Sequence, residues 1–292
     1  MRIGGRKPSI LFLHLIAIIV ASLGVFPLIY IFSFSFKSLQ EIYTHGPSLF
    51  PRHPVWDNYL YILKGLGEYG GQTGGANRLL VLYRNTILVT LSTVALVSII
   101  TSLAGYALAR FKFRGRDFLF FLLVVLTFFP IGGSFLAQYE LMHQLHLRNS
   151  FLGLILLYSA GFGIPLFFMR QVFLHIPSEL EEAARIDGAS DFRIFSQIML
   201  PLATGGLVLA VVMIFIRVWG DNWLCYLMID SAEKMTLGAG MWNLAPITPA
   251  AAGVSREAVV STFLTFFMLP SILLFAGLQR WFIRGAMEGL KL

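Results

Sequence analysis

Charge is scarce in this sequence of 292 residues, and its scarcity limits the kind of protein that the chain can be. Only 13% of the residues are Asp, Glu, Lys or Arg, which is about half the share found in a typical soluble domain, whereas 57% are hydrophobic. This balance excludes an ordinary soluble globular protein. It predicts an integral membrane protein, whose apolar side chains face lipid rather than water.

Several other features are missing. The single cysteine, Cys225, lies in an apolar run, so the chain cannot form an internal disulfide. The phosphate-binding motif G-x-x-x-x-G-K-[ST] does not occur, and the G-x-G-x-x-G match at residues 65–70 has neither a strand before it nor a helix after it. His143 and His146 could share a helix face, but no carboxylate or thiol completes a metal site. We therefore predict no catalytic residue, no metal site and no cofactor on this chain.

Long apolar stretches are abundant, and a bilayer-spanning helix needs about 20 such residues. The first stretch follows Arg2, Arg6 and Lys7, and it is too long for a signal peptide and lacks a clear cleavage site. We therefore expect it to be retained as a span. The fold expected is an all-α integral membrane protein with a single domain, residues 1–292. Its six predicted transmembrane helices are residues 10–34, 86–106, 118–138, 151–173, 205–229 and 259–278.

The basic residues predict the orientation of these spans. Residues 109–117 hold four basic residues, whereas residues 139–150 hold only Arg148. Because short cytoplasmic loops carry the excess of Lys and Arg, the first of these loops should lie inside. With six spans, both termini and the loop at residues 175–203 then also face the cytoplasm. The net charge of +7 is accounted for by lipid headgroups rather than by nucleic acid.

The polar segment between the fourth and fifth spans has the local signals of a helix-turn-helix. Ser178 and Glu181 have the spacing of a capping box, in which each side chain accepts from a backbone N–H of the first turn. Gly188 can adopt the left-handed conformation that ends a helix. Ser190 or Asp191 can then cap a second helix. Taken alone, this pattern also fits an ordinary amphipathic connector.

Residues 182–202, EAARIDGASDFRIFSQIMLPL, resemble the "EAA" loop of binding-protein-dependent ABC importer permeases. The shared pattern is Glu-Ala-Ala, three residues, Gly, nine residues, and Ile-x-Leu-Pro. In that family the loop docks onto a separate ATPase, and the resemblance implies the same here. The residues implied in ATPase coupling are Glu182, Ala183, Ala184, Asp187, Gly188 and Pro201.

Further segments resemble the maltose-type sugar permeases of this family, namely residues 102–116, 149–158, 234–241 and 278–285. The resemblance implies an ABC importer permease fold with several partners: a second homologous permease, two ABC ATPases that hold ATP and Mg²⁺, and a solute-binding protein outside. The outer loop at residues 238–256 should reach toward that binding protein. The residues expected to contact it are Gly240, Trp242, Asn243 and Pro246.

Arg217 and Asp221 are charges within the fifth predicted span, and charges at this depth usually face an interior or a pathway. Their spacing of four residues would place them on one helix face. Trp219, Asn222 and Trp223 flank them, and aromatic faces and amide groups suit sugar rings and hydroxyls. The five residues are therefore candidates for the substrate pathway. A structural ion pair between Arg217 and Asp221 is the alternative.

The predicted function is that of a non-enzymatic permease subunit, multi-pass in the bacterial cytoplasmic (inner) membrane. It would import a sugar or oligosaccharide, with Arg217 compatible with an acidic one such as an alginate or uronate oligosaccharide. The alternatives are an ABC importer permease for another small solute and a secondary transporter driven by an ion gradient. A secondary transporter would be expected to carry midplane carboxylates in repeated halves, and only Asp221 resembles one. An intramembrane enzyme is disfavoured, since no catalytic cluster is apparent.

Overall fold

A computed structural model describes residues 10–44, 48–64, 75–128, 134–244 and 253–289. Within these ranges every regular element is a helix, so the all-α prediction is confirmed. The helices are α1 (Ile10–Phe34), α2 (Leu39–Thr44), α3 (Asp57–Lys64), α4 (Gly75–Arg110), α5 (Arg116–Leu126), α6 (Phe135–Gln144), α7 (Phe151–Ser159), α8 (Gly163–His175), α9 (Glu179–Ile186), α10 (Asp191–Ile194), η3 (Phe195–Met199), α11 (Leu200–Leu202), α12 (Thr204–Trp219), α13 (Trp223–Met228), η4 (Ala232–Lys234), α14 (Leu237–Leu244) and α16 (Arg256–Gly289).

Three described helices have the length and apolarity to cross a bilayer: Ile10–Phe34, Leu79–Arg110 and Arg256–Trp281. Two bent pairs qualify when each is counted as one span, which brings the total to five. In the first pair α7 and α8 meet at 53°, and in the second Asp191–Leu202 and α12 meet at 78°. The third predicted span is divided between α5 and α6, with residues 129–133 outside the described part. The count of six therefore stays a prediction.

The fifth predicted span differs from expectation. Helix α12 ends at Trp219, and a new short helix, α13, begins at Trp223. Residues 205–229 are thus a helix, a break and a second helix, rather than one continuous helix. Hydropathy alone did not reveal the break, because the residues on both sides of it are apolar.

Close contacts divide the chain into two units, residues 1–77 with 243–269 and residues 78–242 with 270–292. In the first unit, side chains of later segments donate hydrogen bonds to the backbone that directly follows α1. The side chain of Asn58 donates to the carbonyl oxygens of Ser35 and Lys37, at 2.8 and 2.9 Å, and the Thr262 hydroxyl donates to Ser35 at 3.3 Å. Tyr59 also packs edge-on against Phe266 of α16. These contacts join α3 and the first part of α16 to the end of α1.

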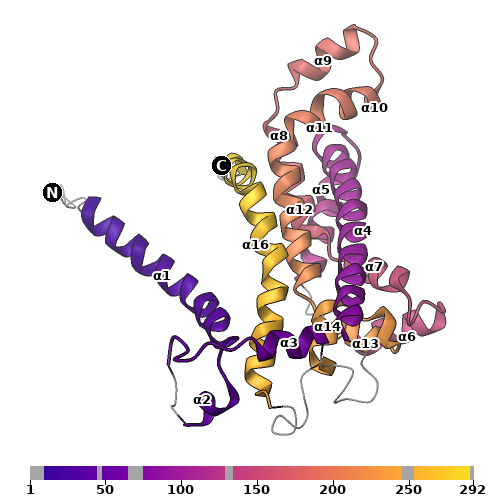
Figure 1. Ribbon diagram of the computed structural model, residues 1–292. Helices are drawn as coiled ribbons and strands as arrows, with labels where there is room; N and C mark the ends of the chain where they lie inside the picture. Colours follow the sequence, from indigo (N-terminus) through magenta and orange to yellow (C-terminus); the bar gives the residue numbers. More distant parts are fainter. Residues whose placement is uncertain (1–9, 45–47, 65–74, 129–133, 245–252, 290–292) are drawn as a thin grey trace, which may run out of the picture. The chain divides into compact units, whose positions relative to one another are not determined.

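In the second unit α8 packs against α12 and α5, while α13 packs against α6 and α7 (Figure 1). Helices α9 and α10 lie beyond one end of α4 and α8 (Figure 1). We call this end of the unit, where the loop at residues 175–203 lies, the loop end. A buried cluster there joins Tyr106 of α4 and Phe173 of α8 to Ala184 and Phe195 from the loop. The polar loop is therefore anchored to the spans by apolar packing.

Gly188 forms the corner of the loop with φ of 81°, which confirms the predicted left-handed conformation. The Ser190 hydroxyl accepts from the backbone N–H of Arg193 and caps α10. After α10 the chain makes one π-helical turn, Phe195–Met199, before Pro201 and the bend into α12. A π-turn inserts an extra residue per turn and a proline removes a backbone donor, so both accompany the sharp change of direction.

Two local predictions are wrong. The Ser178 hydroxyl makes no capping hydrogen bond, because Ser178 is already helical, and the Glu181 carboxylate turns to another partner instead of reaching back. The outer segment at residues 238–256 was expected to be a loop, but its first part is helix α14. The small residues of this segment suggested a loop, whereas in the structure they let the helix pack closely against its neighbours, as Gly240 does against Leu82.

Candidate functional site

Helix α9 has one face against its own chain and one face in the open. Glu181 and Ala184 are 7% and 9% exposed and lie on the inner face. Glu182 and Ala183 are exposed, and so are Asp187 and Gly188 after them. The prediction that Ala184 offers its side chain to a partner surface is therefore wrong, because its methyl group packs into the buried cluster at the loop end. Glu182 and Ala183 remain candidates for a docking surface.

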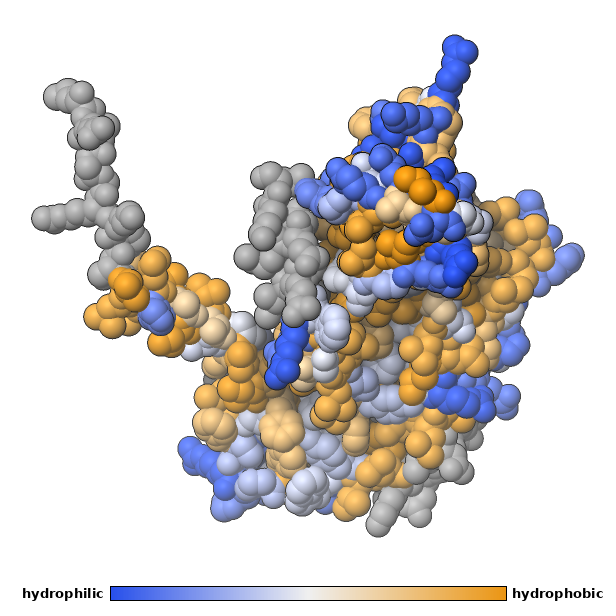
Figure 2. All heavy atoms as spheres, turned by 90° about the horizontal axis from the view of Figure 1, so that it is seen from above, coloured by the Kyte–Doolittle hydropathy of each residue, from blue (hydrophilic) through white to orange (hydrophobic). Residues whose placement is uncertain are grey.

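Sequence reasoning missed two exposed apolar side chains of this loop. Ile186 is 86% exposed and Phe192 is 72% exposed. Ile186 lies two residues after the buried Ala184, which at 100° per residue places it on the opposite face of α9, beside Glu182 and Ala183. Knowing which face is buried would have identified it. In Figure 2, which views the molecule from the side of α9 and α10, hydrophilic side chains gather around a few apolar ones.

An ion pair that the sequence did not predict holds the inner face of α9. The Arg110 Nε lies 2.8 Å from the Glu181 Oε1, and the two side chains are only 13% and 9% exposed. Arg110, the last residue of α4, also donates to the backbone carbonyl oxygen of Ile176, just before α9. One guanidinium thus binds both the start of the loop and its first helix. A displacement of α9 would therefore be transmitted to the end of α4 through Arg110.

The two intramembrane charges do not form the ion pair that was the structural alternative to a pathway role. Arg217 lies in α12 and donates to the carbonyl oxygens of Gly161 and Tyr158, where α7 ends and α8 begins. Carbonyl groups at a helix end lack intrahelical partners, and inside a bilayer no water supplies them. Arg217 therefore donates to unpaired carbonyl groups at the helix break rather than to a carboxylate.

Asp221 lies beyond the end of α12, so the prediction that it shares a helix face with Arg217 is wrong. Its Oδ2 accepts from the Tyr158 hydroxyl at 2.7 Å and from the backbone N–H of Leu224 at 3.0 Å. It thereby caps α13 and ties it to α7. Around it, Trp219 is buried and stacked on Phe215, whereas Asn222 is half-buried and Trp223 is 69% exposed. A pathway role for these residues stays a prediction.

The residues expected to meet a binding protein are placed unevenly. Gly240 is buried in α14, and a Cβ there would lie 2.6 Å from the Leu82 Cδ1, so Gly240 packs against α4 and is not available to a partner. Trp242 and Asn243 also belong to α14. Pro246 lies outside the described residues. Within the described residues no group of three or more His, Cys, Asp or Glu side chains could hold a metal ion.

Residues 87–287 match the family model described as binding-protein-dependent transport system inner membrane component. The chain belongs to this family. The match begins inside α4, runs through the loop and ends within α16, and so includes both the EAA-like segment and the broken helices. The resemblance inferred from the loop is thereby confirmed.

Two curated relatives align over nearly the whole chain. The arabinooligosaccharides transport system permease protein AraQ of Halalkalibacterium halodurans is 30% identical over 92% of this chain and 92% of its own. The sn-glycerol-3-phosphate transport system permease protein UgpE of Pectobacterium atrosepticum is 29% identical over 99% of this chain and 100% of its own. Both are permease proteins, and their solutes differ.

Among solved structures, a chain from a bacterial ABC transporter involved in the import of the acidic polysaccharide alginate superimposes with a TM-score of 0.76. The superposition covers 96% of this chain and 99% of that chain, at 23% sequence identity. At this identity the likeness shows the fold. The fold of this chain is therefore that of an ABC importer permease.

Proposed function

We propose that this protein is the membrane-spanning permease subunit of an ATP-driven importer, in which the loop at residues 175–203 transmits movement of an ATPase to the spans. The observation that carries the proposal is the two-faced helix α9. Its inner face is bound to α4 through Arg110 and to the core through Ala184, while its outer face exposes Ile186 at 86%. Two strongly exposed apolar side chains among polar ones, those of Ile186 and Phe192, favour a docking surface with an apolar centre and a polar rim.

The solute that best fits is a sugar or an oligosaccharide. A relative named for arabinooligosaccharides and a fold match from an alginate importer support this class, and the latter is compatible with an acidic oligosaccharide. The relative named for sn-glycerol-3-phosphate keeps another small solute as the alternative. At the start of α13, Asn222 and the exposed Trp223 offer an amide group and an aromatic face, both of the kind that binds sugars.

The partners are a second permease, two ATPases that hold ATP and Mg²⁺, and a solute-binding protein. The family description, which specifies dependence on a binding protein and an inner membrane component, supports the last partner and the membrane. In this mechanism the ATPases close on ATP, α9 moves with them, and the Arg110–Glu181 contact carries that movement into α4. The chain itself catalyses nothing. A secondary transporter would not co-purify with an ATPase.

The test compares substitutions on the two faces of α9. Ala183→Trp adds a large side chain on the exposed face, Glu182→Lys reverses a charge there, and Gly188→Val places a β-branched residue at φ of 81°, a conformation such residues avoid. All three should leave the yield of the chain near normal yet release the ATPase from the purified membrane complex or uncouple ATP hydrolysis from uptake. ATPase retention and solute uptake in vesicles are the measurements.

Ala184→Trp is the matched control, since its larger side chain would enter the chain's own core. Overpacking of a buried site costs typically 1–3 kcal/mol, so this variant should lower the yield of folded chain instead. Normal ATPase retention and normal uptake in all three outer-face variants would remove the coupling role. Uptake assays with neutral and acidic oligosaccharides and with glycerol phosphate would then separate the solute classes.

A further inference from the structure

A basic turn, residues 111–116, connects α4 to α5 at the loop end and is not explained by the packing of the spans. It carries Lys112, Arg114 and Arg116, and Arg170 of α8 lies beside it. Asp117 pairs with two of these four cations, Arg116 and Arg170. The Arg110 guanidinium is already engaged by Glu181 and does not add to this group.

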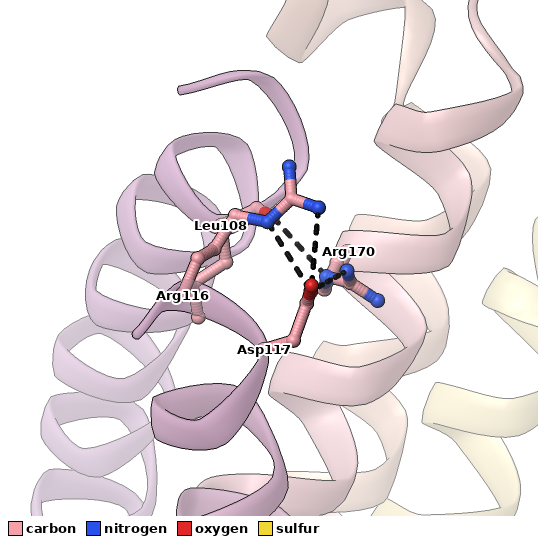
Figure 3. Close-up of polar contacts among 4 residues, drawn as sticks. All are labelled: Leu108, Arg116, Asp117 and Arg170. Carbon is pink, nitrogen blue, oxygen red and sulfur yellow. Dashed lines mark hydrogen bonds and ion pairs between the residues drawn. The ribbon is translucent and has the colours of Figure 1, made fainter. Parts of the chain in front are cut away.

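The close-up in Figure 3 shows how Asp117 orders part of this turn. Its Oδ1 lies 3.2 Å from the Arg116 Nε and 3.1 Å from the Arg170 Nη2, and the Arg170 Nε donates to the Leu108 carbonyl oxygen at 3.2 Å. The two guanidinium groups are therefore held in place from α4 and α5. The Asp117 side chain is 72% exposed, so solvent screens it and it offsets the cations only weakly.

Two cations of the turn have no partner among the residues that the structure describes. The side chains of Lys112 and Arg114 are exposed, and neither makes a hydrogen bond or an ion pair with any residue that the structure describes. A surface pocket of about 360 Å³ opens beside Lys112. It is lined by Lys112, Phe113, Gly115, Arg116, Asp117 and Phe118.

Apolar side chains adjoin the cations. Phe113 is 46% exposed, Phe118 is 70% exposed and Phe121 is 64% exposed. From Phe118 onward α5 is an apolar run that ends at Leu126. The pocket thus lies where a polar turn gives way to the apolar helix α5, which belongs to the third predicted span. Such a boundary is where phospholipid headgroups meet acyl chains.

We propose that this pocket binds the phosphate headgroup of an anionic phospholipid. Lys112 and Arg116, which line the pocket, would contact the phosphate, and Arg114 would add positive charge from the adjoining turn. Phe113 and Phe118 would lie along the first part of the acyl chains. The inference rests on the proposed placement of the loop end at the inner face of the membrane. A soluble anion would satisfy the cations but would leave the aromatic side chains without a partner.

The test uses the full membrane complex, delipidated in detergent and titrated with phosphatidylglycerol or with phosphatidylcholine of the same acyl chains. Retained lipid is counted by native mass spectrometry. The unaltered complex should prefer phosphatidylglycerol. Lys112→Gln/Arg114→Gln should weaken phosphatidylglycerol binding roughly 30-fold, since each cation near a membrane surface contributes about a factor of five. Phosphatidylcholine binding should not change.

Matched controls remove or preserve the same charge. Arg84→Gln/Arg256→Gln deletes two exposed cations near the starts of other candidate spans and should change phosphatidylglycerol binding less than about twofold. Lys112→Arg/Arg114→Lys should bind as the unaltered complex does. Equal losses in the two neutralised variants, or no preference in the unaltered complex, would overturn the proposal.

Two further outcomes would assign the turn to another ligand. Displacement of phosphatidylglycerol by inorganic phosphate alone would indicate a soluble-anion site. Release of the ATPase by Lys112→Gln/Arg114→Gln, with lipid preference intact, would assign these cations to that partner. Lipid binding is measured without ATP or solute, whereas the proposed function is tested by uptake. Failure of one is therefore distinguishable from failure of the other.

Discussion

Among single residues, Arg217 shows how a charge can be accommodated inside a bilayer without an opposite charge. Its guanidinium binds the carbonyl oxygens of Tyr158 and Gly161, which the break between α7 and α8 leaves without helical donors. Asp221 solves the complementary problem by accepting from the Leu224 N–H at the start of α13. The two residues thus serve opposite helix ends, and Tyr158 joins them through its carbonyl and its hydroxyl groups.

We expect Arg217→Ala to destabilise the complex, because each buried carbonyl left without a donor costs about 1–3 kcal/mol. The measurement is the thermal midpoint and the yield of the purified complex. The charge swap Arg217→Asp/Asp221→Arg should not restore them, since an arginine at 221 cannot accept from Leu224 and Tyr158. Recovery by the swap would show that the two charges act as a pair.

At the scale of elements, α9 is a short helix whose position depends on contacts with other segments. Eight residues are too few for a stable helix in isolation. The Arg110–Glu181 ion pair and the packing of Ala184 against the core hold it against α4 and α8. The exposed face with Ile186 is presented outward as a result. The coupling proposed here therefore depends on residues of the hidden face as much as on those of the exposed one.

A double-mutant cycle on Arg110 and Glu181 tests this arrangement. Breaking a buried ion pair by removing one partner costs roughly 3–5 kcal/mol, because the other charge is left buried. Arg110→Ala and Glu181→Ala should each lower the thermal midpoint and ATPase retention. The double variant should lose less than the sum, by about 0.5–3 kcal/mol. Additive losses would mean that the two side chains do not interact.

For the whole molecule, the distribution of apolar surface supports a chain that lies among lipids and other subunits. The most apolar window of α1 is 0% buried within the chain, and Ile10, Leu11 and Leu23 are each at least 69% exposed. In water such a helix would aggregate, whereas in a bilayer it is at its lowest free energy. Orientation is the property of the whole molecule that still depends on the basic-residue asymmetry alone.

Orientation is testable with single cysteines introduced into a Cys225→Ser background, in which no native thiol remains to react. Ile186→Cys, in the loop, should react with an impermeant reagent only after the cells are opened. Ala232→Cys, between α13 and α14, is exposed and should react from outside intact cells. Labelling of Ile186→Cys in intact cells would reverse the predicted topology.

The sequence by itself determined the properties that depend on composition and on residues adjacent in the chain. The low charge specified a membrane protein, the apolar run at residues 10–34 coincided with α1, and Gly188 marked the corner of the loop. The EAA-like spacing identified the family, because its residues recur at fixed intervals within one segment. These signals act within a helix or a turn, so they can be read along the chain.

The tertiary structure alone decided which distant groups became partners. Glu181 had the spacing for a local cap, yet its carboxylate is paired with the Arg110 guanidinium of α4, because the fold brings the two buried charges to within 2.8 Å. Ala184 read as an open patch but faces the core, and Arg217 found backbone carbonyl groups at a helix break that hydropathy did not reveal. Each outcome depends on segments that only the folded chain brings together, which is why no local pattern predicted it.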